Sequence, residues 1–317
     1  MPVADAVQGP GVAADVLIVA LAALYWVPYH RRARRLAREG RSVPRWRQWC
    51  YAAGIVVLIF ALSTPLGVLS EKLLYAHMIE HLLIGDIAAL LIVLGLTGPM
   101  IAPLLRIGPI SRLRVFVNPL VALPVWAVSL YVWHIPFLYQ AALRNEGVHA
   151  IEHACFLLAG IAMWMALLGP LPKPAWFGSL AMLGYVIAVR LIEGILGNVF
   201  LWSHTIFYPY YRVHEAGYSI SPLQDQIDAG AVMMVEGSIL TILLFGWLFM
   251  RAASQYEERQ RLLDYARLHD LDLDEARAAR AVAAGRGDEL QHRLEERVAA
   301  VPPRASSGRP AGAPRDT

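Results

Sequence analysis

Two copies of one short motif carry the residues best suited to chemistry in this 317-residue chain. The first copy is His77-Met-Ile-Glu80-His81 and the second is His149-Ala-Ile-Glu152-His153. On an α-helix the two histidines of each copy lie on one face, with the glutamate beside them. Each copy opens a long apolar run. Ionisable groups in or near hydrocarbon are energetically costly, and those that occur there usually serve ion or proton chemistry. The doubled motif therefore predicts a metal or proton site.

The elements that must position this site are membrane helices. The sequence is 57% hydrophobic and 17% charged, which indicates an integral membrane protein. Seven apolar runs approach the roughly 20 residues needed to cross a bilayer. They cover residues 13–29, 49–69, 73–96, 118–138, 148–168, 178–201 and 226–250. We therefore expect an all-α, polytopic bundle of seven transmembrane helices.

The composition changes after the last apolar run. Residues 1–250 form the predicted membrane domain, and residues 251–300 mix Arg, Glu, Asp, Ala and Leu as in a charged helical tail. Residues 301–317 are rich in Pro, Gly, Ser and Arg without apolar periodicity, so this end is expected to be disordered.

Basic residues in the short loops predict the orientation. One set of alternate loops carries Arg31, Arg32, Arg34, Arg35, Arg38, Arg41, Arg45, Arg47, Arg106, Arg112, Arg114 and Lys173, whereas the other carries Lys72, Arg144 and Arg212. Lys and Arg mark the cytoplasmic side of a membrane. The N-terminus is therefore predicted outside and the C-terminus, with the charged tail, in the cytoplasm. Topogenic charge explains the arginine-rich loop without a nucleic-acid partner.

This topology brings the candidate ligands to one side. Both motifs begin at the outer ends of their spans, and His134 ends the fourth span on that side. His204 and His214 fall in the long outer loop after the sixth span. We expect an outward-facing metal site made of His77, His81, His134, His149 and His153. Acidic groups are expected to support these histidines by hydrogen bonding, namely Glu80, Glu152, Asp225 and Asp228.

Imidazole ligands suit zinc, copper, iron and nickel, and softer sulfur ligands favour cuprous copper. Met78 and Cys155 are the candidate soft ligands within the motif helices, and Met233 and Met234 lie in the last span. Deeper in the spans, Arg190, Glu193 and Glu236 are predicted to form an intramembrane ion pair or a relay.

Several stretches of the sequence resemble those of a known family. Trp133-His134-Ile-Pro136, then Tyr139-Gln-Ala-Ala-Leu143 and the second motif, resemble the CtaG family of bacterial cytochrome c oxidase assembly proteins. The first motif running into Gly98-Pro99, Phe207-Tyr208-Pro209 and Asp225-Gln226 with Gly230 look similar too. The resemblance covers about residues 10–250 and departs at Met233-Met234, where a tryptophan is expected.

The resemblance implies a multi-pass protein of the bacterial plasma membrane that helps copper reach the catalytic subunit of a haem-copper oxidase. That function is not enzymatic, and it implies the oxidase subunit, an extracytoplasmic copper donor and the lipid bilayer as partners.

Two alternatives remain open from the residues. The motif is also the inverted signature of zinc metalloproteases, in which the glutamate activates water. Facing histidines such as His81 and His153 could instead hold haem in an electron-transfer protein that reacts with quinone.

Overall fold

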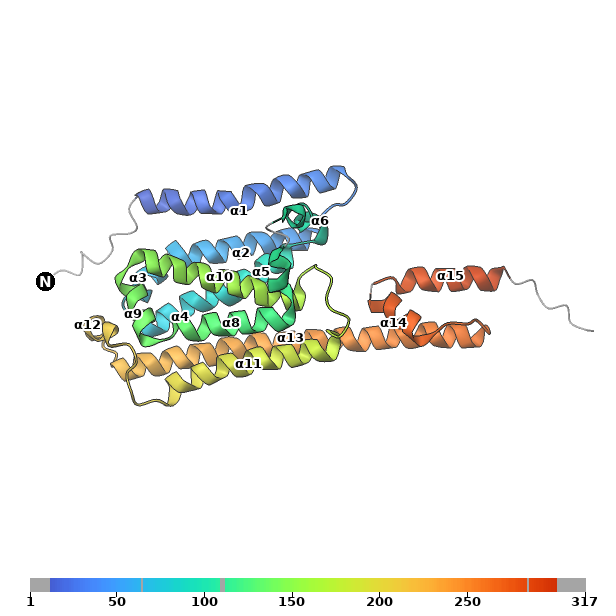
Figure 1. Ribbon diagram of the computed structural model, residues 1–317. Helices are drawn as coiled ribbons and strands as arrows, with labels where there is room; N and C mark the ends of the chain where they lie inside the picture. Colours follow the sequence, from blue (N-terminus) through green and yellow to red (C-terminus); the bar gives the residue numbers. More distant parts are fainter. Residues whose placement is uncertain (1–11, 64, 109–111, 284, 301–317) are drawn as a thin grey trace, which may run out of the picture. The chain divides into compact units, whose positions relative to one another are not determined.

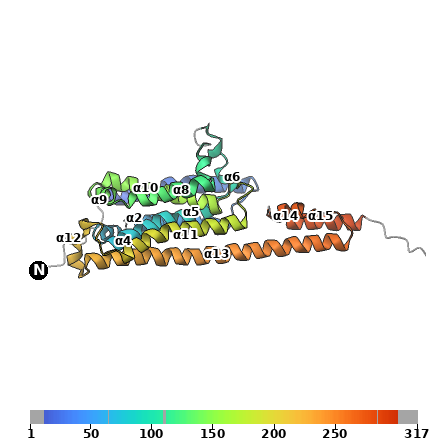
Figure 2. The same ribbon diagram turned by 60° about the horizontal axis from the view of Figure 1, so that its bottom comes forward.

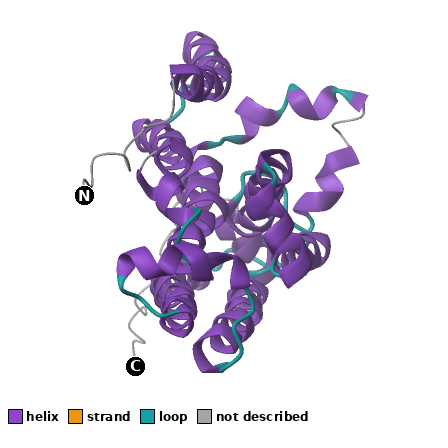
Figure 3. Cartoon of the chain, turned by 90° about the vertical axis from the view of Figure 1, so that its left-hand side faces the viewer, coloured by secondary structure: helices purple, strands orange, loops and turns teal. Residues whose placement is uncertain are grey.

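The computed structural model describes residues 12–63, 65–108, 112–283 and 285–300. Every regular element in these ranges is a helix, and Figure 3 shows only helices and loops there. The predicted all-α class is confirmed for this part of the chain. The tail predicted to be disordered, 301–317, lies outside the described residues. By its internal contacts the chain divides into two units, Met1–Phe245 and Gly246–Thr317.

Helices of very different length make up the first unit (Figure 1). In chain order they are α1 (Val12–Arg38), α2 (Arg45–Ser63), α3 (Pro65–Ser70), α4 (Leu74–Leu82), the π-helix η2 (Leu83–Ala88), α5 (Ala89–Gly95), α6 (Gly98–Ile101), the short 3-10 helices η3 (Leu104–Arg106) and η4 (Leu113–Val117), α8 (Pro119–Trp133), α9 (Pro136–Arg144), α10 (Glu146–Leu168), α11 (Ser179–Trp202), η5 (Pro209–Tyr211), α12 (Arg212–Glu215), η6 (Ala216–Tyr218) and the first part of α13 (Pro222–Leu268).

Long apolar helices make the chain a membrane protein. Five helical runs among the described residues are long and apolar enough to cross a bilayer: α2, α4 through α5, α10, α11 and α13. A sixth arises if α8 and α9, bent by 72° where they meet, form one broken span. The predicted first span, 13–29, falls in α1, which is not among these candidates. The seven-span topology and its orientation therefore stay predictions.

Prolines begin new helices inside two predicted spans. In the run 49–69, α2 ends at Ser63 and α3 starts at Pro65, and residue 64 between them lies outside the described part. The run 118–138 breaks after Trp133, since Ile135 is extended (φ −63°, ψ 127°) and Pro136 opens α9. A proline disfavours helical geometry at the residue before it and fits the first turn of the next helix. The second break leaves His134 at the corner between two helices.

The two helices that carry the motifs pack closely. Gly160 of α10 lies so near the backbone of η2 that an added Cβ would collide with the carbonyl oxygen of Gly85. Two glycines at a crossing allow backbones to approach closely in a membrane. The π-turn that contains Gly85 also shifts the helix register after Leu82. This contact sets the distance between the first motif on α4 and the second on α10.

The second unit comprises the end of α13, α14 (Glu275–Ala283) and α15 (Gly287–Ala299). Figure 2 shows α14 and α15 beside the end of α13. A small apolar core of Leu262, Val282, Leu290 and Leu294 holds the three together. Gly285, with φ +66°, provides the turn between α14 and α15.

Candidate metal centre

The five histidines predicted as ligands come together at one end of the first unit. His77 and His81 project from α4, and His149 and His153 project from the first turns of α10. His134 caps the C-terminal end of α8. Figure 3 views the helices from the end at which α4 and α10 begin.

Four imidazole rings form a compact cluster, which we call the histidine cluster: His77, His81, His149 and His153. Within each helix, the ring centroids are 4.2 Å apart for His77 and His81 and 4.1 Å apart for His149 and His153. Between the helices, they are 5.3 Å apart for His77 and His149 and 5.4 Å apart for His81 and His153. Residues four apart in each helix thus face their counterparts across the interface.

The glutamates cross over between the two motifs. Oε2 of Glu152 lies 4.0 Å from Nε2 of His77 and 3.9 Å from Nε2 of His81. Oε1 of Glu80, in turn, lies 3.7 Å from Nε2 of His153. Each carboxylate therefore faces the imidazoles of the other copy, which ties the two helices into one polar centre.

This centre is buried and poorly hydrogen-bonded. His77, Glu80, His81 and Glu152 are at most 4% exposed. Within the described chain, both ring nitrogens of His77 and His81 and both carboxylate oxygens of Glu152 are buried without a hydrogen-bond partner. Buried polar atoms nearly always have partners, because leaving them unpaired costs stability. So many unpaired polar atoms in one place indicate that an ion or a ligand binds among them.

The donor atoms fall into two overlapping sets, each with atoms within 4.8 Å of one another. The first contains His77, His81, His149 and Glu152, and the second contains Glu80, His149 and His153. Imidazole and carboxylate donors at this spacing fit a first-row transition metal. His149 belongs to both sets, so it links the two groups of donor atoms.

His134 lies beside the cluster rather than in either set. Its ring centroid is 6.5 Å from that of His81. Its Nδ1 donates to the carbonyl oxygen of Leu130 (2.6 Å), and its Nε2 lies 3.5 Å from the sulfur of Met78. Of the predicted soft ligands, Met78 is thus next to a candidate histidine. Neither donor set among the described residues includes Cys155, which is half-buried on α10.

The start of α13 holds the cluster in place. The carboxylate of Asp225 accepts hydrogen bonds from the backbone N–H groups of Leu74 (2.7 Å) and Tyr75 (2.9 Å), which open α4. It therefore caps the helix one turn before His77, a role that the sequence alone did not suggest. Asp228 is half-buried and accepts a hydrogen bond from Gln224.

Three buried tyrosines cover the same end. Tyr208 donates to the backbone carbonyl of His134 (2.7 Å), and Tyr211 donates to that of Ser70 (3.3 Å). Tyr139 bonds to Tyr211 (3.1 Å). Burial raises the pKa of Tyr208 and of Tyr211, both outside the spans, so these hydroxyls stay protonated as donors. His204 is exposed in the nearby loop, and the side chain of His214 lies outside the described part.

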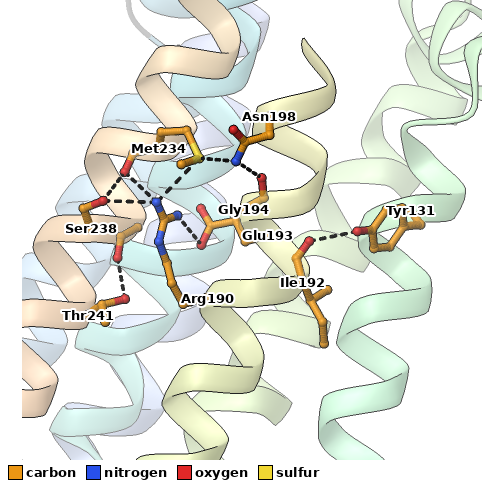
Figure 4. Close-up of polar contacts among 10 residues, drawn as sticks. Tyr131, Arg190, Ile192, Glu193, Gly194, Asn198, Met234, Ser238 and Thr241 are labelled. Atoms are coloured by element: carbon orange, nitrogen blue, oxygen red, sulfur yellow. Dashed lines mark hydrogen bonds and ion pairs between the residues drawn. The ribbon is translucent and has the colours of Figure 1, made fainter. Parts of the chain in front are cut away.

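A second polar group lies farther along the helices, where α11 packs on α13 (Figure 4). Arg190 donates to the carbonyl oxygen of Met234 (3.0 Å) and to Ser238 (3.1 Å), and its Nη1 lies 4.0 Å from Oε2 of Glu193. Both carboxylate oxygens of Glu236 are buried without a hydrogen bond among the described residues. The predicted group of Arg190, Glu193 and Glu236 thus involves two helices, α11 and α13, and includes a hydrogen bond to the backbone.

Asp86 is the residue that the sequence reading missed. It lies in the π-turn η2 and lines two small cavities, both shared with Glu193. An aspartate within the apolar run 73–96 is itself a signal, because ionisable groups are rare in spans and usually functional.

An all-helical membrane protein with a buried histidine–carboxylate centre is the class that the fold and the site define. The model of the family described as cytochrome c oxidase caa3 assembly factor (Caa3_CtaG) matches residues 11–255. The chain belongs to this family, which confirms the resemblance seen in the motifs.

Curated relatives from mycobacteria are similar over most of the chain. A Mycobacterium bovis protein is 23% identical over 278 residues, covering 80% of this chain and 42% of the relative. A Mycobacterium leprae protein is 24% identical over 260 residues, covering 76% of this chain and 39% of the relative. Both are described as uncharacterised, and the chain spans about two fifths of their length. No solved structure matches the chain.

Proposed function

We propose that this assembly factor binds copper at the histidine cluster and passes it to the catalytic subunit of a haem-copper oxidase. The observation that carries the proposal is the set of buried imidazoles and carboxylates that lack hydrogen-bond partners among the described residues. Such donors suit several transition metals, and copper is one of the metals that a haem-copper oxidase contains. Zinc and haem are the alternatives.

The arginine-rich loops support an outward-facing cluster in the bacterial plasma membrane, with the N-terminus outside and the C-terminus in the cytoplasm. In this arrangement an extracytoplasmic donor loads the site, and the oxidase subunit docks beside it in the bilayer. Glu80 and Glu152 orient the imidazoles or take up the protons released when copper binds. Asp225 acts through the backbone of α4.

The crossed carboxylates support binding rather than proteolysis. A zinc peptidase needs one glutamate to serve as the base beside its own two histidines, together with a third protein ligand. Here each glutamate approaches the histidines of the other motif. Membership of an assembly-factor family, which is typically non-enzymatic, points the same way.

The available space argues against haem held between His81 and His153. Their ring centroids are only 5.4 Å apart, and the cavity beside His81 is about 30 Å³. Pockets for organic ligands measure roughly 300–1,000 Å³, so a porphyrin would require the helices to separate. A metal ion requires no such change.

Metal analysis of the purified protein tests the proposal. We expect bound copper, cuprous or cupric, and we expect the His77→Ala/His149→Ala double variant to lose most of it while remaining folded in the membrane. His269→Ala and His292→Ala, both exposed in the second unit, are the controls and should keep wild-type copper. Wild-type copper in the double variant would exclude the cluster as the binding site. A Soret absorption band would indicate haem instead.

Thiol labelling tests the orientation. In a variant without Cys50 and Cys155, Glu146→Cys and Thr205→Cys should react with an impermeant reagent added from outside. Ser42→Cys and Ala175→Cys should react only after permeabilisation, although all four positions are exposed. The reverse pattern would place the histidine cluster on the cytoplasmic side and end the proposal of outward loading.

A further inference from the structure

The side chains of Met78 and His134 approach each other through two atoms that both carry lone pairs. Nδ1 of His134 contacts the carbonyl oxygen of Leu130, which can only accept, so Nδ1 carries the proton. The unprotonated Nε2 therefore points its lone pair at the sulfur of Met78, 3.5 Å away. A thioether sulfur also has only lone pairs to offer. Two acceptors face each other with no proton between them.

The spacing suits a shared ion. Nitrogen and sulfur ligands lie roughly 2.0–2.3 Å from a first-row metal ion. Two such ligands at a tetrahedral angle are therefore roughly 3.5 Å apart, which is the separation seen for His134 and Met78. Thioether and imidazole together select cuprous copper over harder ions.

A small cavity surrounds this pair and provides further donors. Its volume of about 30 Å³ holds about one or two water molecules or one ion. Its lining includes Met78, His81, His134, Met233, Asp86 and Glu193. Met233, from α13, is 2% exposed and brings a second sulfur.

The cavity also provides carboxyl groups that can supply a counter-charge to a bound cation. A cation in hydrocarbon needs a nearby counter-charge, because solvation is lost there. Glu193 is 7% exposed, and its Oε1 is buried without a hydrogen-bond partner in the described chain. Its other oxygen faces Arg190, as Figure 4 shows. Asp86 lines the same cavity, and Asp86 and Glu193 also line a neighbouring cavity together with Arg190.

We propose that Met78 and His134, with Met233 and His81 around them, form a second site beside the histidine cluster, specific for cuprous copper. The site rests on the proposed copper function. It would receive cuprous copper from the cluster, with no change of oxidation state, through His81, which belongs to a cluster donor set and also lines the cavity.

Cuprous titration under reducing conditions, with a competing chelator, tests this site in the full-length protein. Met78→Leu should bind one cuprous ion fewer than the wild type. Met163→Leu is the matched control, because Met163 is also a fully buried methionine but does not line the cavity. Zinc, which prefers harder ligands than a thioether, should bind equally to both variants.

X-ray absorption at the copper edge gives an independent readout. The wild-type protein should show a sulfur neighbour at roughly 2.3 Å, and Met78→Leu should weaken or lose it. Unchanged stoichiometry in Met78→Leu, or wild-type cuprous copper without a sulfur neighbour, would overturn the second site and leave the histidine cluster untouched. A wild-type protein that binds no copper in either oxidation state would overturn the proposed function itself. The wild-type spectrum decides the question even if Met78→Leu does not fold.

Discussion

The two His-x-x-Glu-His motifs have the same pattern but lie in different surroundings. His77 and His81 are 0% and 4% exposed, whereas the side chain of His153 is 13% exposed and His149 is half-buried. The first motif leads into a π-turn with a half-buried aspartate, and the second continues as a regular α-helix. The second motif is thus the accessible half of the centre and the first is the enclosed half.

The N-termini of the two motif helices, α4 and α10, are also capped by different kinds of contact. Asn145 caps α10 from the adjacent position, accepting hydrogen bonds from Gly147 and Val148. The start of α4, in contrast, depends on Asp225, which is 150 residues away in the chain. The enclosed motif therefore depends on the rest of the bundle for its position, while the accessible motif is defined locally. Repetition in sequence does not imply equivalence in structure.

The largest difference between the motifs should appear when the glutamates are changed. Glu152 approaches two buried imidazoles, whereas Glu80 approaches one that is partly exposed. Loss of a carboxylate that supports a metal-bound histidine typically weakens binding by roughly 10–100-fold. We expect Glu152→Gln to weaken copper affinity about 100-fold and Glu80→Gln to weaken it about 10-fold. Copper competition on the purified proteins measures both affinities.

The same variants separate metal delivery from proteolysis in cells. Both should assemble less oxidase at low copper and recover when copper is raised, because mass action offsets weaker binding. A catalytic glutamate behaves differently, since loss of a general base costs roughly 10²–10⁴-fold or more in rate. If one variant is inactive at every copper level and the other is silent, a single peptidase motif explains the data better.

The sequence was sufficient to predict which residues would gather. Spacing of four residues placed each histidine pair on one helical face, and alternation of spans brought both motifs and His134 to one end. It could not predict that the glutamates cross between motifs, because helical periodicity does not define how two helices rotate against each other. That rotation depends on contacts such as Gly85 with Gly160.

Other features depend on the folded bundle. Asp225 was predicted to support the histidines, and its hydrogen bonds to the backbone at the start of α4 join segments that only the folded bundle brings near each other. Asp86 was overlooked inside a strongly apolar run. The contact of Met78 with His134 depends on the corner at Pro136, which a single straight span from 118 to 138 does not contain.

A smaller effect should distinguish the two helix starts. Asp225→Ala and Asn145→Ala each remove one capping side chain, and the loss of such a cap costs about 1 kcal/mol. Both variants should therefore show a fall in the unfolding temperature in detergent, larger for Asp225→Ala because Asp225 is buried and Asn145 is exposed. Only Asp225→Ala should also weaken copper binding, because it frees the turn of α4 that carries His77, whereas α10 keeps its packing against η2. Equal copper affinity in the two variants would mean that the enclosed motif holds its own position, and the contrast between a locally defined and a bundle-dependent motif would fail.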